Sequence, residues 1–302
     1  MKLPTFSYSK WDKHSGKMGC PRKMKFSMID YLCTLCFKGP VPRDSKTCPH
    51  CNGEIVKSVA LTGGLLFAQT VEAFIKGETE EFPEGVRNTS ARAAIIKLKA
   101  ARATNPARIL VEPKFFFDKN WGPTHQNQYG PNSGGLDVLV LDPDTLTAQI
   151  IDWKTGSVTE ARKQLKKGVE GQYDEQLELY STMVFKVFPW VQEISTHIYY
   201  VSAVDVGRTD RRTYVRADLP GMAAKWARRQ QEVNGDKDFA PRIGFWCSFC
   251  DFAPKKGGPC SVKAGPGAIQ VAEGPIDPVE GEADIWVDPE ILAKLEREMA
   301  GG

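Results

Sequence analysis

Two aspartates and a lysine form the group of residues with the clearest chemical potential in this sequence. Asp137 precedes an apolar run, Asp152 closes another, and Lys154 follows Asp152 at a spacing of two. Carboxylate oxygens bind Mg2+ or Mn2+, and an ammonium group can orient or stabilise an attacking hydroxide. Metal-assisted hydrolysis of a phosphodiester requires such a trio, provided that the fold brings the three side chains together.

A predicted β-hairpin brings the two aspartates together. Apolar runs rich in branched residues flank residues 143–146, which have the composition of a turn. With these four residues as the turn, the register places Asp137 opposite Asp152. Like charges on opposite strand positions destabilise a sheet, and a cation between them removes this penalty. Because strand side chains alternate between faces, Lys154 lies on the same side as Asp152.

Three further residues complete the candidate site. Glu112 lies within the strand-like run ILVEPKFFF, where an acid is costly unless it is at an edge or binds a metal. Gln176 and Tyr180 are four residues apart in a predicted helix, so they share one face and can bind a phosphate or nearby backbone. An isolated Asp-x-Lys is usually a surface ion pair at a strand end. The opposing Asp137 favours the catalytic interpretation here.

The eight cysteines form two sets of four. Two tight Cys-x2-Cys pairs, separated by eleven residues rich in turn formers, are typical of a zinc ribbon. A closed shell of four thiolates leaves no position for a substrate, so we expect a structural Zn2+. The ribbon cysteines are Cys33, Cys36, Cys48 and Cys51, and the second set is Cys20, Cys247, Cys250 and Cys260. By residue type alone, the second set suits an iron–sulfur cluster or a second zinc ion.

The elements that must position these side chains form a mixed α/β pattern. Helical spacing of apolar residues predicts helices, and branched or aromatic runs predict strands. The predicted helices are 58–77, 88–104, 170–188 and 219–233, and the predicted strands are 107–118, 134–142, 146–153, 193–204 and 213–217. A polar, Gly-rich segment at 119–135 is expected to be a loop. This order predicts a mixed central sheet flanked by helices.

Composition and charge restrict the class of protein. With 41% apolar and 25% charged residues, the 302-residue chain has the balance of a globular protein. Eighteen apolar residues never follow one another, and the first residues lack an apolar stretch, so we expect no membrane span, no signal peptide and a cytoplasmic location. Residues 263–302 hold nine acids and three bases, a net charge of −6. Because the whole chain carries a charge of +3, residues 1–262 carry +9. A basic body fits a polyanionic partner such as DNA.

At these residues the sequence resembles the RecB-like branch of the PD-(D/E)XK nucleases. The resemblance rests on Glu112, on GGLD with Asp137, on IDWKTG with Asp152 and Lys154, and on QLELY with Gln176 and Tyr180. It implies a restriction-endonuclease-like core in which the three acids bind Mg2+ or Mn2+, the lysine assists the water, and the glutamine and tyrosine position the substrate strand. One departure is Ala68, which stands where many members of the family have a histidine.

The second cysteine set resembles that of the iron–sulfur members of this branch. Cys20 precedes Pro and basic residues, as the first cluster cysteine does in those relatives, and the other three follow the core as Cys-x2-Cys-x9-Cys. The resemblance implies a 4Fe-4S cluster that holds the two ends of the chain together, with a second zinc ion as the rival. The zinc ribbon has the character of an insertion.

These observations predict the following organisation: an N-terminal segment with the first cluster cysteine at 1–30, a zinc ribbon at 31–55, the nuclease core at 56–240, the cysteine cluster at 241–262, and an acidic linker with a short helix at 263–302. We expect a metal-dependent DNA exonuclease that acts on single strands or duplex ends during phage or bacterial recombination, repair or replication. Its acidic tail would contact a protein of that machinery, shield the basic groove or remain disordered. The alternative is a catalytically inactive DNA-binding or scaffolding protein with structural metal centres.

Overall fold

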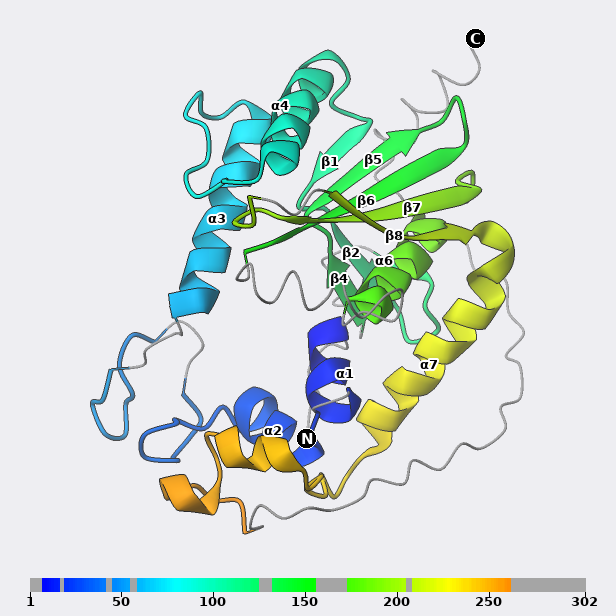
Figure 1. The fold of residues 1–302 in the computed structure, drawn as a ribbon. Helices are drawn as coiled ribbons and strands as arrows, with labels where there is room; N and C mark the ends of the chain where they lie inside the picture. The colour runs from blue at the N-terminus through cyan, green and yellow to red at the C-terminus, as the bar shows by residue number, and fades with distance from the viewer. Residues whose placement is uncertain are drawn as a thin grey trace. The chain divides into compact units, whose positions relative to one another are not determined.

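The computed structural model describes residues 7–16, 19–41, 45–54, 59–124, 132–155, 173–204 and 208–261 (Figure 1). The chain divides into two compact units. The terminal unit contains Met1–Lys57 and Ala224–Glu282, and the sheet unit contains Ser58–Ala223 and Ala283–Gly302. The predicted acidic tail and its helix lie outside the described residues. Within the described part of the chain, no helix is long and apolar enough to cross a membrane.

A mixed sheet forms the centre of the sheet unit. Among the described residues it has five strands in the order β1-β5-β6-β7-β8, with β6 and β7 parallel and the other neighbours antiparallel. The strands are β1 (Ile109–Val111), β5 (Val138–Asp142), β6 (Thr147–Lys154), β7 (Glu193–Tyr200) and β8 (Arg208–Val215). The predicted mixed sheet is therefore confirmed, and β8 begins earlier than the predicted strand at 213–217.

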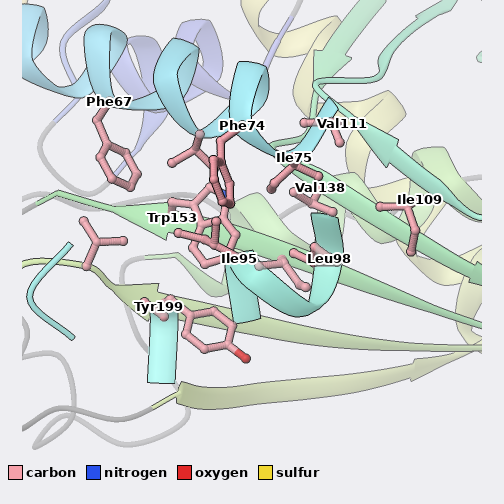
Figure 2. Close-up of a cluster of buried hydrophobic side chains, with 14 residues drawn as sticks. Phe67, Phe74, Ile75, Ile95, Leu98, Ile109, Val111, Val138, Trp153 and Tyr199 are labelled. Carbon is pink, nitrogen blue, oxygen red and sulfur yellow. The ribbon is translucent and has the colours of Figure 1, made fainter. Parts of the chain in front are cut away.

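Helices α3 (Val59–Lys76) and α4 (Thr89–Thr104) pack on one face of this sheet. Figure 2 shows their apolar side chains, among them Phe74 and Ile95, gathered with Trp153 of β6. Asn88 precedes α4 and caps its N-terminus, because its side chain accepts a hydrogen bond from Ala91 N at 2.9 Å. Since strand side chains alternate, burial of Trp153 on this face directs Asp152 to the other.

A smaller sheet and helix α6 (Asp174–Val187) complete this unit. The small sheet has the order β3-β2-β4 and consists of β2 (Lys114–Phe117), β3 (Pro123–Thr124) and β4 (Asn132–Gly135). The run 107–118, predicted as one strand, is thus two strands in different sheets. The break lies at Glu112, whose φ is +52°, and at Pro113, which has no N–H to donate. The predicted loop at 119–135 also contains β3 and β4.

The terminal unit joins segments from early and late in the chain. His14 Nε2 lies 2.8 Å from Asp236 Oδ2, and Arg22 Nε donates to Phe239 O at 3.0 Å. Arg242 Nη1 donates to Gly16 O at 2.9 Å. The elements of this unit are α1 (Tyr8–Ser15), α2 (Pro21–Met24), the π-helix η1 (Lys25–Ile29), and the 3-10 turns η4 (Phe245–Phe249) and η5 (Pro254–Lys256). Helix α7 (Leu219–Gly235), which follows η3 (Arg216–Asp218), crosses the boundary between the units.

Candidate nuclease site and cysteine centres

The strand register brings the three predicted acids into one row. Strands β5 and β6 pair from Asp142 opposite Thr147 to Val138 opposite Ile151, which confirms the register predicted from the turn. One further step places Asp137 opposite Asp152. On the other side, Glu112 N donates to Asp137 O at 2.9 Å and continues the β1–β5 pairing. Glu112, Asp137 and Asp152 therefore occupy neighbouring positions on three adjacent chain segments.

Lys154 links this row to helix α6. Its Nζ lies 2.6 Å from Asp152 Oδ2 and donates to Gln176 Oε1 at 3.3 Å. Gln176 Nε2 in turn donates to Tyr180 OH at 2.7 Å. The structure thus brings the predicted Lys154, Gln176 and Tyr180 together with Asp152, and the two helix residues hold the lysine through a hydrogen-bonded relay.

Ionisation of Asp137 carries an electrostatic cost. Burial and then the negative charge of Asp152 raise the pKa of Asp137 to about 8, although Trp153 N donates to its Oδ2 at 2.6 Å. Burial acts to lower the pKa of Lys154, but the charges of Asp152 and Asp137 raise it above its ordinary value. One ammonium therefore faces a buried carboxyl group, that of Asp152, and a partly buried one, that of Asp137. An oxygen donor set with excess negative charge fits a divalent cation such as Mg2+ or Mn2+.

Glu112 is a third carboxylate beside this pair. Burial and then the charge of Glu72 raise the pKa of Glu112, and the charge of Asp152 acts in the same direction. Glu72 lies in α3, where it forms an ion pair with Lys76 at 2.5 Å. The positive φ of Glu112 turns the chain from β1 into β2 at the point where its carboxyl group lies near the site.

A comparison of the chain with protein families agrees with this geometry. The sequence model of the PD-(D/E)XK nuclease superfamily matches residues 65–254, which is more than half of the chain and includes every acid described above. The chain belongs to the PD-(D/E)XK nuclease superfamily. Members of this superfamily are generally nucleases that act on nucleic acid with the help of divalent metals.

Two other comparisons complete this result. No curated protein matches the chain. A solved structure described as "Crystal structure of SSO0001" is similar over 65% of this chain and 85% of its own length, with 15% sequence identity and a TM-score of 0.28.

Three residues near this PD-(D/E)XK site were missed at the level of sequence. The ring centroid of Tyr173 lies 4.4 Å from Lys154 Nζ, and the charges of Glu72 and Lys114 act on Glu112. Tyr173 precedes Gln176 by three residues, a spacing that places both on one helix face and could have identified it. Nothing in the local sequence signals Glu72 or Lys114, because their proximity to Glu112 depends on how α3 and β2 pack.

Ala68 occupies the position at which many of the RecB-like nucleases that the sequence resembles have a histidine. Positions 64, 68 and 72 lie at helical spacing on one stripe of α3. At one end of the stripe, a Cβ on Gly64 would lie 3.4 Å from Thr155 Oγ1, and at the other end Glu72 acts electrostatically on Glu112. Ala68 therefore lies between two residues adjacent to the site, and its methyl group offers no metal ligand.

The four ribbon cysteines form a compact group outside the matched region. Their sulfur atoms all lie within 4.8 Å of one another, and Cys36 Sγ is 3.7 Å from Cys48 Sγ. The two halves repeat the same backbone bonds: Leu35 N donates to Cys33 Sγ at 3.3 Å, and His50 N donates to Cys48 Sγ at 3.4 Å. Four cysteines are thereby arranged as a metal site, as predicted.

The second cysteine set lines one cavity in the terminal unit. Cys20, Cys247, Cys250 and Cys260 share this cavity with Phe26, Trp246 and Phe252 and with the cations Arg22, Lys23 and Arg242. Burial raises the pKa of Cys250, and the charges of Cys20 and Cys260 add to this effect. Among the described residues, only the ribbon cysteines have three or more ligand atoms mutually within 4.8 Å. The sulfurs of the second set are therefore spread more widely than those of the ribbon, and so are the carboxylate oxygens of Glu112, Asp137 and Asp152.

Proposed function

We propose that this PD-(D/E)XK protein is a Mg2+- or Mn2+-dependent deoxyribonuclease that removes nucleotides from DNA ends. The observation that carries the proposal is the row formed by Asp137 and Asp152 with Lys154 at 2.6 Å from Asp152. Within this superfamily, a buried and a partly buried acid with an ammonium next to them suit hydrolysis better than a purely structural role, because the charge cluster destabilises the metal-free fold.

Each side chain has a proposed task. Asp137, Asp152 and Glu112 would hold the metal, which supplies a water of lowered pKa and neutralises charge on the phosphate when bound. Lys154 keeps an ammonium group beside Asp152, where it stabilises the attacking hydroxide. Gln176 and Tyr180, through their relay to Lys154, position the substrate strand.

The two cysteine sets have different proposed occupants. Ligands at about 2.3 Å in a tetrahedron lie about 3.8 Å from one another, which matches the 3.7 Å between the Cys36 and Cys48 sulfurs and favours Zn2+ in the ribbon. The wider second set, around a cavity lined by Phe26 and Phe252, favours a larger group, a 4Fe-4S cluster, over a second zinc ion. On this proposal the protein would belong to the iron–sulfur, RecB-like branch and would act in phage or bacterial DNA recombination, repair or replication in the cytoplasm.

Cleavage of defined DNA substrates tests the proposed activity. We expect nucleotide release from linear single-stranded or duplex DNA with Mn2+ or Mg2+, none with EDTA, and none from closed circular single strands. Asp152→Asn should abolish release. Asp142→Asn is the matched control, because Asp142 lies in the same hairpin but pairs with Thr147 at the exposed turn.

Two outcomes would overturn the proposal in different ways. DNA binding without cleavage by either metal would identify the inactive DNA-binding or scaffolding alternative, and cleavage of circles would replace exonuclease action by endonuclease action. Metal analysis of anaerobically purified protein tests the centres separately. One zinc with iron and visible absorption is expected, whereas a colourless protein with two zinc ions would exclude the cluster.

A further inference from the structure

Lys154 is surrounded by three different groups that fix where its nitrogen lies. Asp152 Oδ2 is 2.6 Å from Nζ, and Gln176 Oε1 accepts from Nζ at 3.3 Å. The third group is the ring of Tyr173, whose centroid is 4.4 Å from the same nitrogen. The lysine side chain is only 19% exposed, so these neighbours, rather than water, occupy most of its surroundings.

We propose that Tyr173 is a positioning residue that holds the Lys154 ammonium on the α6 side of the site through the face of its ring. The inference rests on the proposed nuclease function and adds a residue to it. Tyr173 and Gln176 are three residues apart at the start of α6, so one turn of helix presents a ring face and an amide oxygen to the same nitrogen.

The ring contact is needed because the Lys154 ammonium and the proposed metal compete for Asp152. An ammonium held by that carboxylate alone would occupy the oxygen that the proposed metal requires. Cation binding at Asp152 would also repel the lysine, because both carry positive charge. A ring face attracts an ammonium without offering a metal an oxygen ligand. It therefore keeps the lysine nitrogen near the site whether or not a metal is bound to Asp152.

A second lysine in the sheet unit also lies over an aromatic ring, but this ring does not hold it beside a predicted metal ligand. Lys99 Nζ lies 4.3 Å from the ring centroid of Phe74, and it also donates to Thr79 O and Glu80 Oε2. No predicted metal ligand is among its partners in the described structure. Lys99 is therefore an internal control in which a ring contact serves packing alone.

Nuclear magnetic resonance can detect the ring contact independently of activity. In protein labelled with 13C-lysine, the ring current of Tyr173 should shift the ε-CH2 protons of Lys154 upfield. The signal is assigned by its loss in Lys154→Arg. We expect the upfield shift to persist in Tyr173→Phe and to disappear in Tyr173→Leu, while the Lys99 signal stays unchanged in both. A Lys154 signal without an upfield shift in the wild type would overturn the proposal.

Kinetics then tests whether the contact positions the lysine for the reaction. We expect Tyr173→Leu to lower kcat about 10-fold with little change in KM, and Tyr173→Phe to stay within about twofold of the wild type. Tyr173→Ser provides a second ring-free variant if leucine prevents folding, because serine is favoured before a helix. Equal activity of the ring-free variants and the wild type, or equal loss in the phenylalanine and leucine variants, would refute a role for the ring.

Failure of the proposed function has a different signature. A wild type that cleaves no DNA but shows the upfield-shifted Lys154 signal would retain the ring contact and remove the nuclease assignment. A wild type that cleaves DNA but lacks the shift would retain the nuclease assignment and remove the ring contact.

Discussion

The cysteine ribbon and the carboxylate site both gather side chains that could bind a cation, but the chain constructs them in opposite ways. The ribbon collects its four sulfurs from residues 33–51, and two short turns with the same bonding pattern aim them at one point. The carboxylate site collects Glu112, Asp137 and Asp152 from separate segments that meet only when β1, β5 and β6 are in register. A local motif defines the first site, and sheet topology defines the second.

The two sites also differ in what supports them without metal. The carboxylate row lies at the rim of a sheet whose other face is an extensive apolar core, including Trp153 and Phe74 (Figure 2). In the ribbon, the buried cluster consists of cysteines and Val41, with little other apolar material in the described part. Loss of metal should therefore disable the carboxylate site without unfolding it, but should unfold the ribbon.

The largest expected effect is a loss of DNA cleavage when the carboxylate site is changed, together with a gain in thermal stability of the metal-free protein. Asp137→Asn should reduce DNA cleavage at least about 1000-fold, because a proposed metal ligand is lost while the acceptor for Trp153 N is kept. The same variant should unfold at a higher temperature than the metal-free wild type at pH 8, by at least about 2 °C. Thermal unfolding and nucleotide release measured on the same preparations check both statements.

The sign of the stability change follows from the pKa of Asp137, which is raised to about 8 from 3.8. Between these values the folded protein keeps a proton that the unfolded chain has lost, so the stability of the metal-free protein falls as pH rises from about 4 to about 8. Asparagine does not ionise, so its advantage should be present at pH 8 and absent near pH 4. An asparagine variant less stable than the wild type at pH 8 would contradict this account.

Reciprocal cysteine substitutions are expected to have the next largest effect. Cys33→Ser should remove one equivalent of zinc, because the ribbon loses one of its four thiolates, and should leave iron unchanged. Cys250→Ser should remove iron and the visible absorption and leave the zinc in place. Metal analysis of the two variants decides the matter, and loss of both metals in either one would show that the two centres are not independent.

The same difference explains how far the sequence alone could predict the molecule. The ribbon followed from cysteine spacing, and the Asp137–Asp152 register followed from the length of one turn. Pro113 could have indicated the break after Glu112, but the positive φ of Glu112 could not be predicted, because it is imposed by the change from one sheet to another. The proximity of Glu72 and Lys114 to Glu112 could not be predicted either, since it depends on packing between segments distant in the chain.

A smaller effect concerns the pH dependence of metal binding at the carboxylate site. Because Asp137 has a raised pKa of about 8, metal binding below that pH must release its proton. We expect the affinity for Mn2+ to rise about 10-fold per pH unit between about pH 6 and pH 8, then to level off. Titration calorimetry in buffers of different protonation enthalpy should detect uptake of about one proton by the buffer. Asp137→Asn should lack this dependence, and an affinity independent of pH in the wild type would argue against a protonated Asp137.

The smallest expected effect is at Lys114, an exposed cation whose charge acts on Glu112. Its side chain is exposed on β2, it is paired with Gly135, and its charge lowers the pKa of Glu112. A cation in this place suits a substrate phosphate, so Lys114→Gln should raise KM for DNA about 3-fold, leave kcat unchanged and reduce the salt dependence of binding by about one ion. Lys97→Gln, at an exposed position of α4, is the matched control. An equal change in both variants would reduce Lys114 to general surface charge, whereas a change confined to Lys114 would place the substrate backbone at the edge of the acid row.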